Sequence, residues 1–137
     1  MITTRLPAMT GIGWTVTIAD LQGQLRSFVA ERDWEQFHSP KNLVMALTAE
    51  VGELTEIFQW LTPEQSLDVM SDPVAATHVA DELADVMAYL IRLADVLQVD
   101  LAEALRSKIT KNAVKYPTDL ARGTAMKYSD LPGREKA

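Results

Sequence analysis

The sequence predicts an all-α protein, a helical bundle of about four main helices, and three observations support this fold class. Apolar residues recur at helical spacing over several long stretches, no stretch alternates in the manner of a strand, and prolines stand where helices begin or end. The chain has 137 residues with 47% hydrophobic content, which suits a single domain with its own core. It has no cysteine, so disulfides and thiolate metal sites are excluded.

The charge balance narrows the possible partners. Lysine and arginine total 13 against 19 aspartate and glutamate residues, a net charge of −6, which disfavours binding to a nucleic-acid polymer. A small phosphorylated ligand remains compatible, because bound metal ions can supply positive charge. No stretch has the length of a membrane span, and the N-terminus lacks the apolar core of a signal peptide. We therefore expect no membrane contact and a cytoplasmic location.

Capping signals mark where the helices should begin. The sequence divides into an irregular arm at 1–16, an all-α domain at 17–117 and an extended arm at 118–137. A residue whose side chain can cap a helix, often followed by proline, precedes each expected helix: Thr17, Ser39-Pro40, Thr62-Pro63, Asp72-Pro73 and Asp100. The second helix should reach about residue 61, the helix starting at 73 should reach about 98, and Pro117 should end the last.

The helix expected at 40–61 carries carboxylates close to its apolar face. At about 100° of rotation per residue, one broad arc gathers Leu43, Val44, Leu47, Val51, Leu54, Phe58 and Leu61. Glu50 falls inside that arc and Glu53 on its edge, whereas Glu56 points the opposite way and is expected to be solvated.

The helix expected at 73–98 has a similar arrangement. Its apolar arc contains Val79, Leu83, Val86, Met87, Leu90, Leu93 and Leu97. Glu82 lies at the margin of this arc, and Asp85, Tyr89 and His78 lie further along the same side. Asp81, Arg92 and Asp95 are expected to point outward. Two helices therefore each present an acidic pair at i, i+3 spacing near the buried seam.

Four clustered carboxylates favour a bound cation. A buried carboxylate without a partner is costly, and neither apolar arc contains a lysine or arginine that could neutralise it. Oxygen ligands without cysteine, and with few histidines, indicate Mg²⁺ or Mn²⁺ rather than zinc. The spacing by itself leaves surface charge as an alternative, because ExxE is common on amphipathic helices.

The motifs also resemble a known family. The segments "AERDWEQFHSPKNLVMALTAEVGELTEIFQW", "DELADVMAYLIRLA" and "SKITKNAVKYP" resemble the dCTP pyrophosphatase family, within the all-α MazG-like nucleoside triphosphate pyrophosphatases. The likeness covers residues 20–132 and includes the family signature, ExxE followed by ExxD. In this chain the signature corresponds to Glu50, Glu53, Glu82 and Asp85.

The resemblance implies an activity, a cofactor and an assembly. Family members hydrolyse a nucleoside triphosphate between its α- and β-phosphates, with dCTP and 5-modified dCTP as typical substrates, and so cleanse the nucleotide pool. It implies Mg²⁺, with Mn²⁺ as a possible substitute, held by the four signature carboxylates, of which Glu50 and Glu53 are the catalytic candidates. Glu53 is our choice to orient or deprotonate the attacking water. The resemblance further implies a homo-tetramer with shared active sites, which fits an apolar first helix bearing Leu21, Leu25 and Phe28.

The last expected helix carries candidate phosphate contacts. Lys108, Asn112 and Tyr116 recur every four residues and share one face, with Lys115 adjacent. By spacing alone, a basic helix end that complements the macrodipole is an equal alternative. The resemblance implies phosphate contacts for Lys108, Asn112 and Tyr116.

Aromatic residues are the candidates for binding the base. Trp34 and Trp60 could stack on a pyrimidine, although Trp60 could equally be ordinary packing. His38 could contact the base or prepare the Ser39 cap, and Tyr89 could close over the sugar. Position 25 departs from the family, because relatives carry a histidine where this chain has Leu25, which puts the preference among pyrimidines in doubt.

Three alternatives stay open at this stage. The same chemistry could act on dUTP or on other, noncanonical dNTPs. A di-iron carboxylate bundle is disfavoured, because it needs ExxH motifs that neither acidic pair provides. A helical interaction module without enzymatic activity would make the acidic pairs purely structural.

Overall fold

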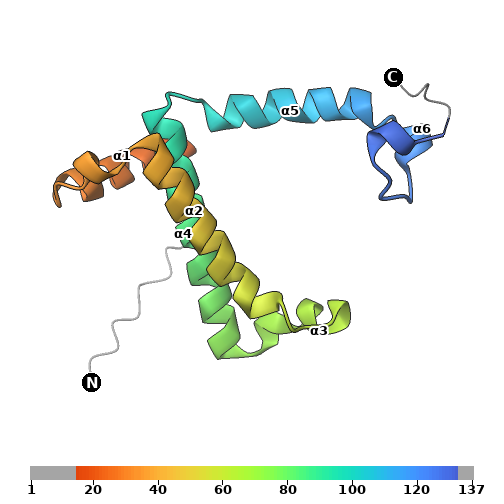
Figure 1. The fold of residues 1–137 in the computed structure, drawn as a ribbon, viewed down its shortest axis with the longest axis horizontal. Helices are drawn as coiled ribbons and strands as arrows, with labels where there is room; N and C mark the ends of the chain where they lie inside the picture. Colours follow the sequence, from red (N-terminus) through yellow and green to blue (C-terminus); the bar gives the residue numbers. More distant parts are fainter. Residues whose placement is uncertain (1–14, 133–137) are drawn as a thin grey trace.

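Every regular element in the described part of the chain, residues 15–132 of this computed structural model, is helical (Figure 1). The elements are α1 (Ile18–Ala30), η1 (Glu35–Phe37), α2 (Pro40–Phe58), α3 (Pro63–Leu67), η2 (Val69–Ser71), α4 (Pro73–Val96), α5 (Leu101–Lys115), α6 (Thr118–Ala121) and η3 (Tyr128–Asp130). The predicted all-α fold class is confirmed. The arm expected at 1–16 lies almost entirely outside the described residues.

The predicted helix starts agree with the capping geometry. The hydroxyls of Thr17 and Thr62 accept hydrogen bonds from the backbone N–H three residues on, and both sites form complete capping boxes. Ser39, Asp72 and Asp100 accept comparable bonds at the starts of α2, α4 and α5. Each start thus depends on local contacts between residues close in the sequence.

Two long helices form the central pair of the chain. Helices α2 and α4 run antiparallel along each other, and α1 packs against α4 near its C-terminal end (Figure 1). The core within residues 15–132 is thin, with six buried apolar side chains: Val29, Leu43, Val79, Ile91, Ala94 and Leu131. The predicted apolar arcs are wider than the surface that one chain covers, because Val51 and Leu83 remain about half exposed.

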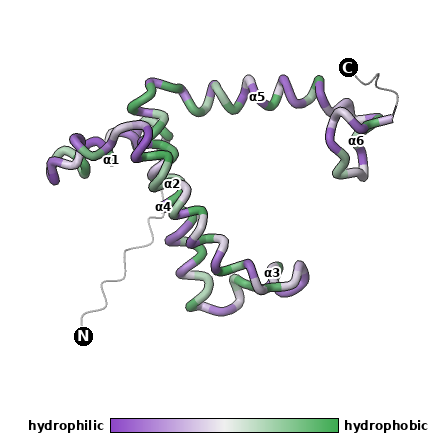
Figure 2. The backbone as a smooth tube through the Cα atoms, viewed as in Figure 1, coloured by the Kyte–Doolittle hydropathy of each residue, from purple (hydrophilic) through white to green (hydrophobic). Residues whose placement is uncertain are grey.

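Helix α4 ends in a Schellman motif that contains no glycine. Gln98 adopts a left-handed φ of 55°, its N–H donates to the Asp95 carbonyl, and the Val99 N–H donates to the Ala94 carbonyl at 2.8 Å. This turn ends α4 two residues before the expected position and directs α5 away from the α2–α4 pair. Helix α5 packs along no other described helix, although apolar and polar positions alternate around it (Figures 1 and 2).

The segment after Pro117, expected to be extended, contains the short helices α6 and η3. Tyr128 packs edge-to-face against Tyr116 with ring centroids 6.1 Å apart, and the Lys115 ammonium lies 5.0 Å from the Tyr128 ring centre. These contacts fold the segment back against the end of α5. No helix among the described residues is long and apolar enough to span a bilayer.

Because α5 has little tertiary support from the other described helices, its stability should depend strongly on its N-cap. The Asp100 carboxylate accepts the Glu103 N–H at 2.9 Å. We expect Asp100→Ala to lower the free energy of unfolding by about 1 kcal/mol and Asp100→Asn, which retains a capping oxygen, to leave it nearly unchanged. Thermal melts followed by circular dichroism measure both, and equal melting temperatures for the two variants would contradict this role of the cap.

Candidate functional site

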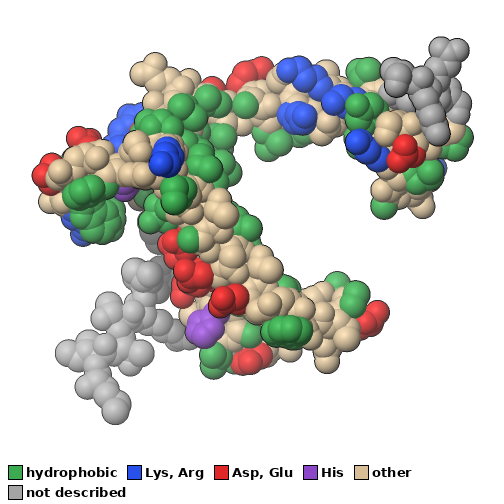
Figure 3. All heavy atoms as spheres, viewed as in Figure 1, with side chains coloured by type: hydrophobic (Ala, Val, Ile, Leu, Met, Phe, Trp, Pro, Cys, Tyr) green, Lys and Arg blue, Asp and Glu red, His purple; other side chains and the backbone are tan. Residues whose placement is uncertain are grey.

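The predicted acidic pairs of α2 and α4 face each other across the helix pair. Oxygens of Glu50 and Glu53 from α2 and of Glu82 from α4 all lie within 4.8 Å of one another. Spacing of i, i+3 places both α2 carboxylates on one side of that helix. Figure 3 shows acidic side chains gathered on this part of the surface. Asp85, one turn after Glu82, lies close enough to raise the pKa values of both Glu50 and Glu82.

The electrostatics of this carboxylate cluster are unfavourable without a cation. Burial raises the pKa of Glu50, and the negative charges of Glu53, Asp85 and Glu82 raise it further. Burial likewise raises the pKa of Glu82, followed by Glu53 and Asp85, and only His78 opposes them among its main neighbours. Ionising the cluster at neutral pH therefore costs free energy that a bound metal ion would recover.

One atom of the cluster fits a metal ligand especially well. The Oε2 atom of Glu82 is buried and accepts no hydrogen bond from the described residues. A buried oxygen without a donor is rare in folded proteins, because the loss of hydration is not compensated. The donor set consists of carboxylate oxygens, which are the ligands that Mg²⁺ and Mn²⁺ prefer. The residues present therefore fit a hard divalent cation.

A cavity of about 240 Å³ adjoins the cluster. It is lined by Leu25, Phe28, Val29, Trp34, His38, Asp85, Ala88, Tyr89 and Arg92. Its volume is below the roughly 300–1,000 Å³ of pockets for drug-sized ligands and suits a single ring with part of a sugar. Asp85 belongs to both the cavity and the cluster, so a ligand bound in the cavity would point its next group toward the carboxylates.

The end of α1 sets the position of Trp34. Asp33 takes a left-handed φ of 52°, and the Trp34 N–H donates to the Val29 carbonyl at 3.1 Å, which closes the helix in a Schellman motif. The turn places the Trp34 ring edge-to-face on Phe28, with centroids 5.8 Å apart. The guanidinium of Arg32 covers the Phe28 ring at 3.7 Å. The indole thus forms a fixed wall of the cavity.

His38 and Tyr89 complete the predicted residues that lie at the cavity, and His38 contacts a residue that was expected elsewhere. The Nε of Arg92 donates to Nδ1 of His38 at 3.3 Å, and its Nη1 donates to Asp95 at 2.9 Å. The expectation that Arg92 and Asp95 point outward was wrong, since their side chains are only 12% and 10% exposed. The cause is α1, whose Arg26 pairs with Asp95 through Nε and Nη2 and covers that side of α4.

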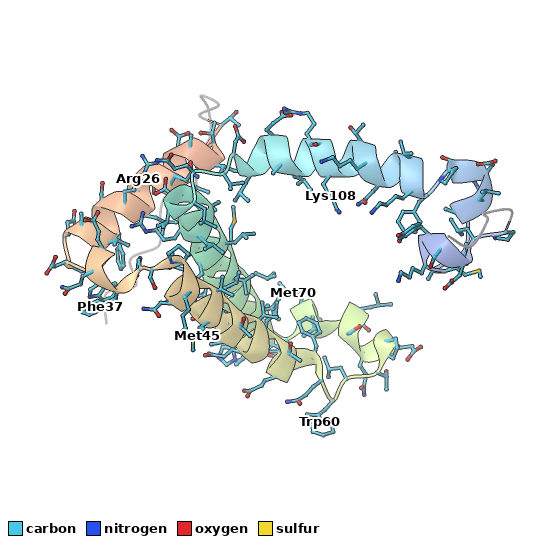
Figure 4. All side chains as sticks on the ribbon, turned by 45° about the horizontal axis from the view of Figure 1, so that its top comes forward. Arg26, Phe37, Met45, Trp60, Met70 and Lys108 are labelled. Atoms are coloured by element: carbon cyan, nitrogen blue, oxygen red, sulfur yellow. The ribbon has the colours of Figure 1, made fainter. Side chains whose placement is uncertain are left out.

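The remaining predicted contacts lie away from the cavity in a single chain. Trp60 is 86% exposed and points away from the end of α2, whereas Lys108 lies on α5, in a separate arm of the chain (Figure 4). Asn112, Lys115 and Tyr116 share that arm with it. One chain therefore brings together the carboxylates, Trp34, His38 and Tyr89, but not the α5 residues or Trp60.

Three residues near the cluster, Glu56, Ile57 and His78, were not predicted as part of the site. A shallow hollow of about 340 Å³ is lined by Glu53, Glu56, Ile57, His78 and Glu82. Glu56 is solvent-exposed, as expected, but it borders this hollow beside Glu53 and not on the far side of the helix. Its i, i+3 spacing from Glu53 is the sequence signal that indicates this neighbourhood.

Fold and site together define a class of protein: an all-α chain whose central helix pair holds a carboxylate cluster beside a small cavity with aromatic walls. The MazG-like family model matches residues 45–131. The chain is 46% identical over 116 residues to mouse (Mus musculus) dCTP pyrophosphatase 1 and 45% identical to the human (Homo sapiens) protein. Each alignment covers 85% of this chain and 68% of the relative.

A solved structure has the same fold. The crystal structure of a pyrophosphatase from Archaeoglobus fulgidus superimposes with a TM-score of 0.69 at 37% identity, covering 78% of this chain and 99% of that one. The chain belongs to the MazG-like family, and its relatives at about 45% identity are dCTP pyrophosphatases.

The orphaned oxygen of Glu82 leads to a stability prediction. The pKa of Glu82 is raised in the folded protein above its ordinary value of 4.5. The protonated side chain therefore stabilises the fold at low pH, and this stabilisation is lost as the pH rises through the folded-state pKa. We therefore expect Glu82→Gln to raise the melting temperature of the metal-free protein at pH 7 by a few degrees, and to abolish any further rise on adding Mg²⁺. Differential scanning calorimetry with EDTA or Mg²⁺ measures both effects.

Glu31→Gln is the matched control, because Glu31 is an exposed glutamate whose only ion pair with another described residue is a long surface contact with Arg32. It should change neither the metal-free melting temperature nor the response to Mg²⁺. A Glu82→Gln variant that melts below the wild type without metal would mean that Glu82 stabilises the fold and does not strain it.

Proposed function

We propose that this chain is a Mg²⁺-dependent pyrophosphohydrolase that cleaves dCTP, or dCTP modified at carbon 5, into the nucleoside monophosphate and pyrophosphate. The observation that carries the proposal is the shared position of Asp85, which lies in both the cavity and the range of the carboxylate cluster. A nucleotide with its base in the cavity would place its phosphates beside the cluster. The dCTP pyrophosphatase relatives support the choice of substrate, and a free nucleotide agrees with a cytoplasmic location.

Glu50, Glu53, Glu82 and Asp85 would hold the metal ion. Bound there, Mg²⁺ would neutralise part of the triphosphate charge and polarise the phosphate oxygens, and Mn²⁺ could substitute for it. Glu53 is the most exposed of the three clustered glutamates and is therefore accessible to a water molecule. We assign Glu53 to orient that water and accept its proton. The water oxygen forms a bond to the α-phosphorus, the bond to the α–β bridging oxygen breaks, and pyrophosphate leaves.

The cavity supplies the base contacts. Trp34 offers a flat apolar wall for stacking, with its ring held by Phe28. Tyr89 lies on α4 one turn after Asp85, between the expected positions of base and phosphates, where it could pack on the deoxyribose. His38 also lines the cavity, and it would face the edge of the base.

A second copy of the chain would complete the site. Helix α5 packs along no other described helix and carries exposed Leu105 and Ile109 on the same helix as Lys108 and Asn112. The α2–α4 pair leaves part of its own apolar arc open. Packing these surfaces together between copies would bury apolar area and bring the α5 cations to the carboxylate cluster of the neighbour. We propose a homo-tetramer with shared sites, in which Trp60 also meets a neighbouring copy.

Hydrolysis itself is the first test. We expect pyrophosphate release from dCTP and 5-methyl-dCTP in the presence of Mg²⁺, none in EDTA, and at least about a 100-fold lower kcat for Glu53→Gln, because a general base contributes on that order. The assay follows pyrophosphate across a panel of canonical and 5-modified nucleoside triphosphates. A folded wild-type protein that hydrolyses none of them would favour the interaction-module alternative.

Mixing two inactive variants tests the shared site. Glu53→Gln and Lys108→Ala should each be inactive alone, yet a mixture refolded together should recover about a quarter of wild-type activity. Half of the pairs in such a mixture are mixed, and one of the two sites in each mixed pair then has both residues intact. Refolding each variant separately before mixing, without subunit exchange, is the control. No recovery after joint refolding would place both residues in the same subunit's site.

The lining of the cavity supports a second candidate substrate. Leu25 lies on the cavity wall at the position where the resemblance implies a histidine. An apolar side chain there offers the base one polar contact fewer, which lowers the discrimination among pyrimidines, so the same chemistry on dUTP or on other, noncanonical dNTPs is the alternative. The ranking of kcat/KM across the panel separates these substrates.

A further inference from the structure

A chain of polar contacts leads from α1 through α4 to His38. Arg26 on α1 pairs with Asp95 through Nε at 2.8 Å and through Nη2. The same Asp95 accepts Nη1 of Arg92 at 2.9 Å, and Nε of Arg92 donates to Nδ1 of His38 at 3.3 Å. Asp95 is thus held by two cations, which lower its pKa through hydrogen bonds from Arg26 first and keep it ionised. We call Asp95, Arg92 and His38 the Arg92 relay.

The relay determines which imidazole nitrogen carries the proton. A guanidinium group has only N–H donors and does not lose its proton in proteins. The Nδ1 atom of His38 must therefore be the acceptor of the Arg92 hydrogen bond and carry no hydrogen. A neutral imidazole with an unprotonated Nδ1 carries its hydrogen on Nε2.

The free nitrogen of His38 is available to a ligand. The imidazole lines the 240 Å³ cavity together with Trp34 and Tyr89. Its Nε2 makes no hydrogen bond to any residue in the described range, whereas Nδ1 is occupied by Arg92. The charged groups at this cavity are Arg92 and Asp85, both from α4. Burial lowers the pKa of His38 and the nearby Arg92 charge lowers it further, which keeps the ring neutral.

We propose that the Arg92 relay locks His38 as the Nε2–H tautomer, so that the cavity presents one fixed hydrogen-bond donor that selects pyrimidines whose ring atom N3 is an acceptor. This inference rests on the proposed function and names the determinant of base choice. Arg92 and Asp95 act as positioning residues, and His38 is the contact residue.

The two candidate bases differ in what a fixed donor meets. Cytosine presents N3 and O2 as adjacent acceptors, whereas uracil carries a hydrogen on N3. A donor directed at N3 therefore pairs with cytosine and opposes the N–H of uracil. Reading a base by hydrogen bonds to its Watson–Crick edge is the usual means of selection in enclosed pockets. A histidine free to change tautomer could satisfy either base and would not discriminate.

Nuclear magnetic resonance of the full-chain protein tests the lock without any substrate. The chain has two histidines, so His78→Gln assigns the His38 signals. Long-range ¹H–¹⁵N spectra should show Nε2–H and bare Nδ1 in the wild type, with the ring still neutral below the ordinary pKa of 6.5. Arg92→Met should raise the His38 pKa and give a mixture of tautomers. Arg26→Met, which loosens the contact between α1 and α4 but leaves the Arg92 bond to His38, is the matched control and should keep the wild-type pattern.

Arg92→Lys is a second variant that keeps the test informative if Arg92→Met does not fold. Lysine keeps a charge opposite Asp95 but cannot also donate from a separate nitrogen to His38. We expect it to fold and to lose the tautomer lock. Steady-state kinetics of the same variants should show the ratio of kcat/KM for dCTP over dUTP falling by about tenfold or more in Arg92→Met and Arg92→Lys. The ratio should stay at the wild-type value in Arg26→Met.

Different results would overturn different claims. A proton on Nδ1 in the wild type, or an unchanged tautomer in both Arg92 variants, overturns the lock regardless of activity. A wild-type enzyme that hydrolyses dCTP and dUTP equally, or Arg92 variants that keep the wild-type ratio, overturns the role in base selection but leaves pyrophosphohydrolase activity standing. Absence of all hydrolysis overturns the proposed function, while the tautomer is judged by its own spectra.

Discussion

The packing of α2 against α4 holds like charges together, and the rest of the site depends on that contact. Leu43 and Val79 are buried on these two helices, so the apolar seam fixes the helices at a separation that their carboxylates oppose. Hydrophobic burial stabilises the pair, whereas the repulsion among the acidic residues destabilises it. A cation at this position removes the conflict. In its absence the fold retains an electrostatic strain at the place where the chemistry is proposed to occur.

Helix α4 packs against both α2 and α1, and these two contacts determine how the cavity is built. One side of it faces α2 with the acidic pair, and another faces α1, where the ionised Asp95 joins Arg26 and Arg92. The loop with Trp34 and His38 connects α1 to α2, so it is fastened at both ends to elements that contact α4. The walls of the cavity and the carboxylates are therefore positioned by one common helix, which keeps their spacing constant.

Local signals made the helix starts and the acidic pairs predictable, because capping boxes, Pro at the first turn and i, i+3 spacing involve residues close in sequence. The burial of Arg92 and Asp95 was not predictable from a single apolar arc, since it arises from a second contact face of α4 against α1. The exact ends of α1 at Ala30 and of α4 at Val96 were not predictable for another reason. Asp33 and Gln98 take the left-handed conformation without the glycine that usually indicates it. The separation of Lys108 from the carboxylates was not predictable either, because the left-handed turn at Gln98 directs α5 away from the α2–α4 pair (Figure 1).

The backbone conformation of Gln98 sets the direction in which α5 leaves α4. Its φ of 55° sets the angle between α4 and α5, and the residue itself belongs to neither the carboxylate cluster nor the α5 cations. Because α5 is a long helix, a small rotation at its N-terminal end moves its C-terminal end by several ångströms. If α5 reaches a neighbouring copy, this junction sets the distance between Lys108 of one subunit and the acidic cluster of another. Relatives could therefore tune subunit spacing, and with it the length of polyphosphate accommodated, by changing a residue that touches no ligand.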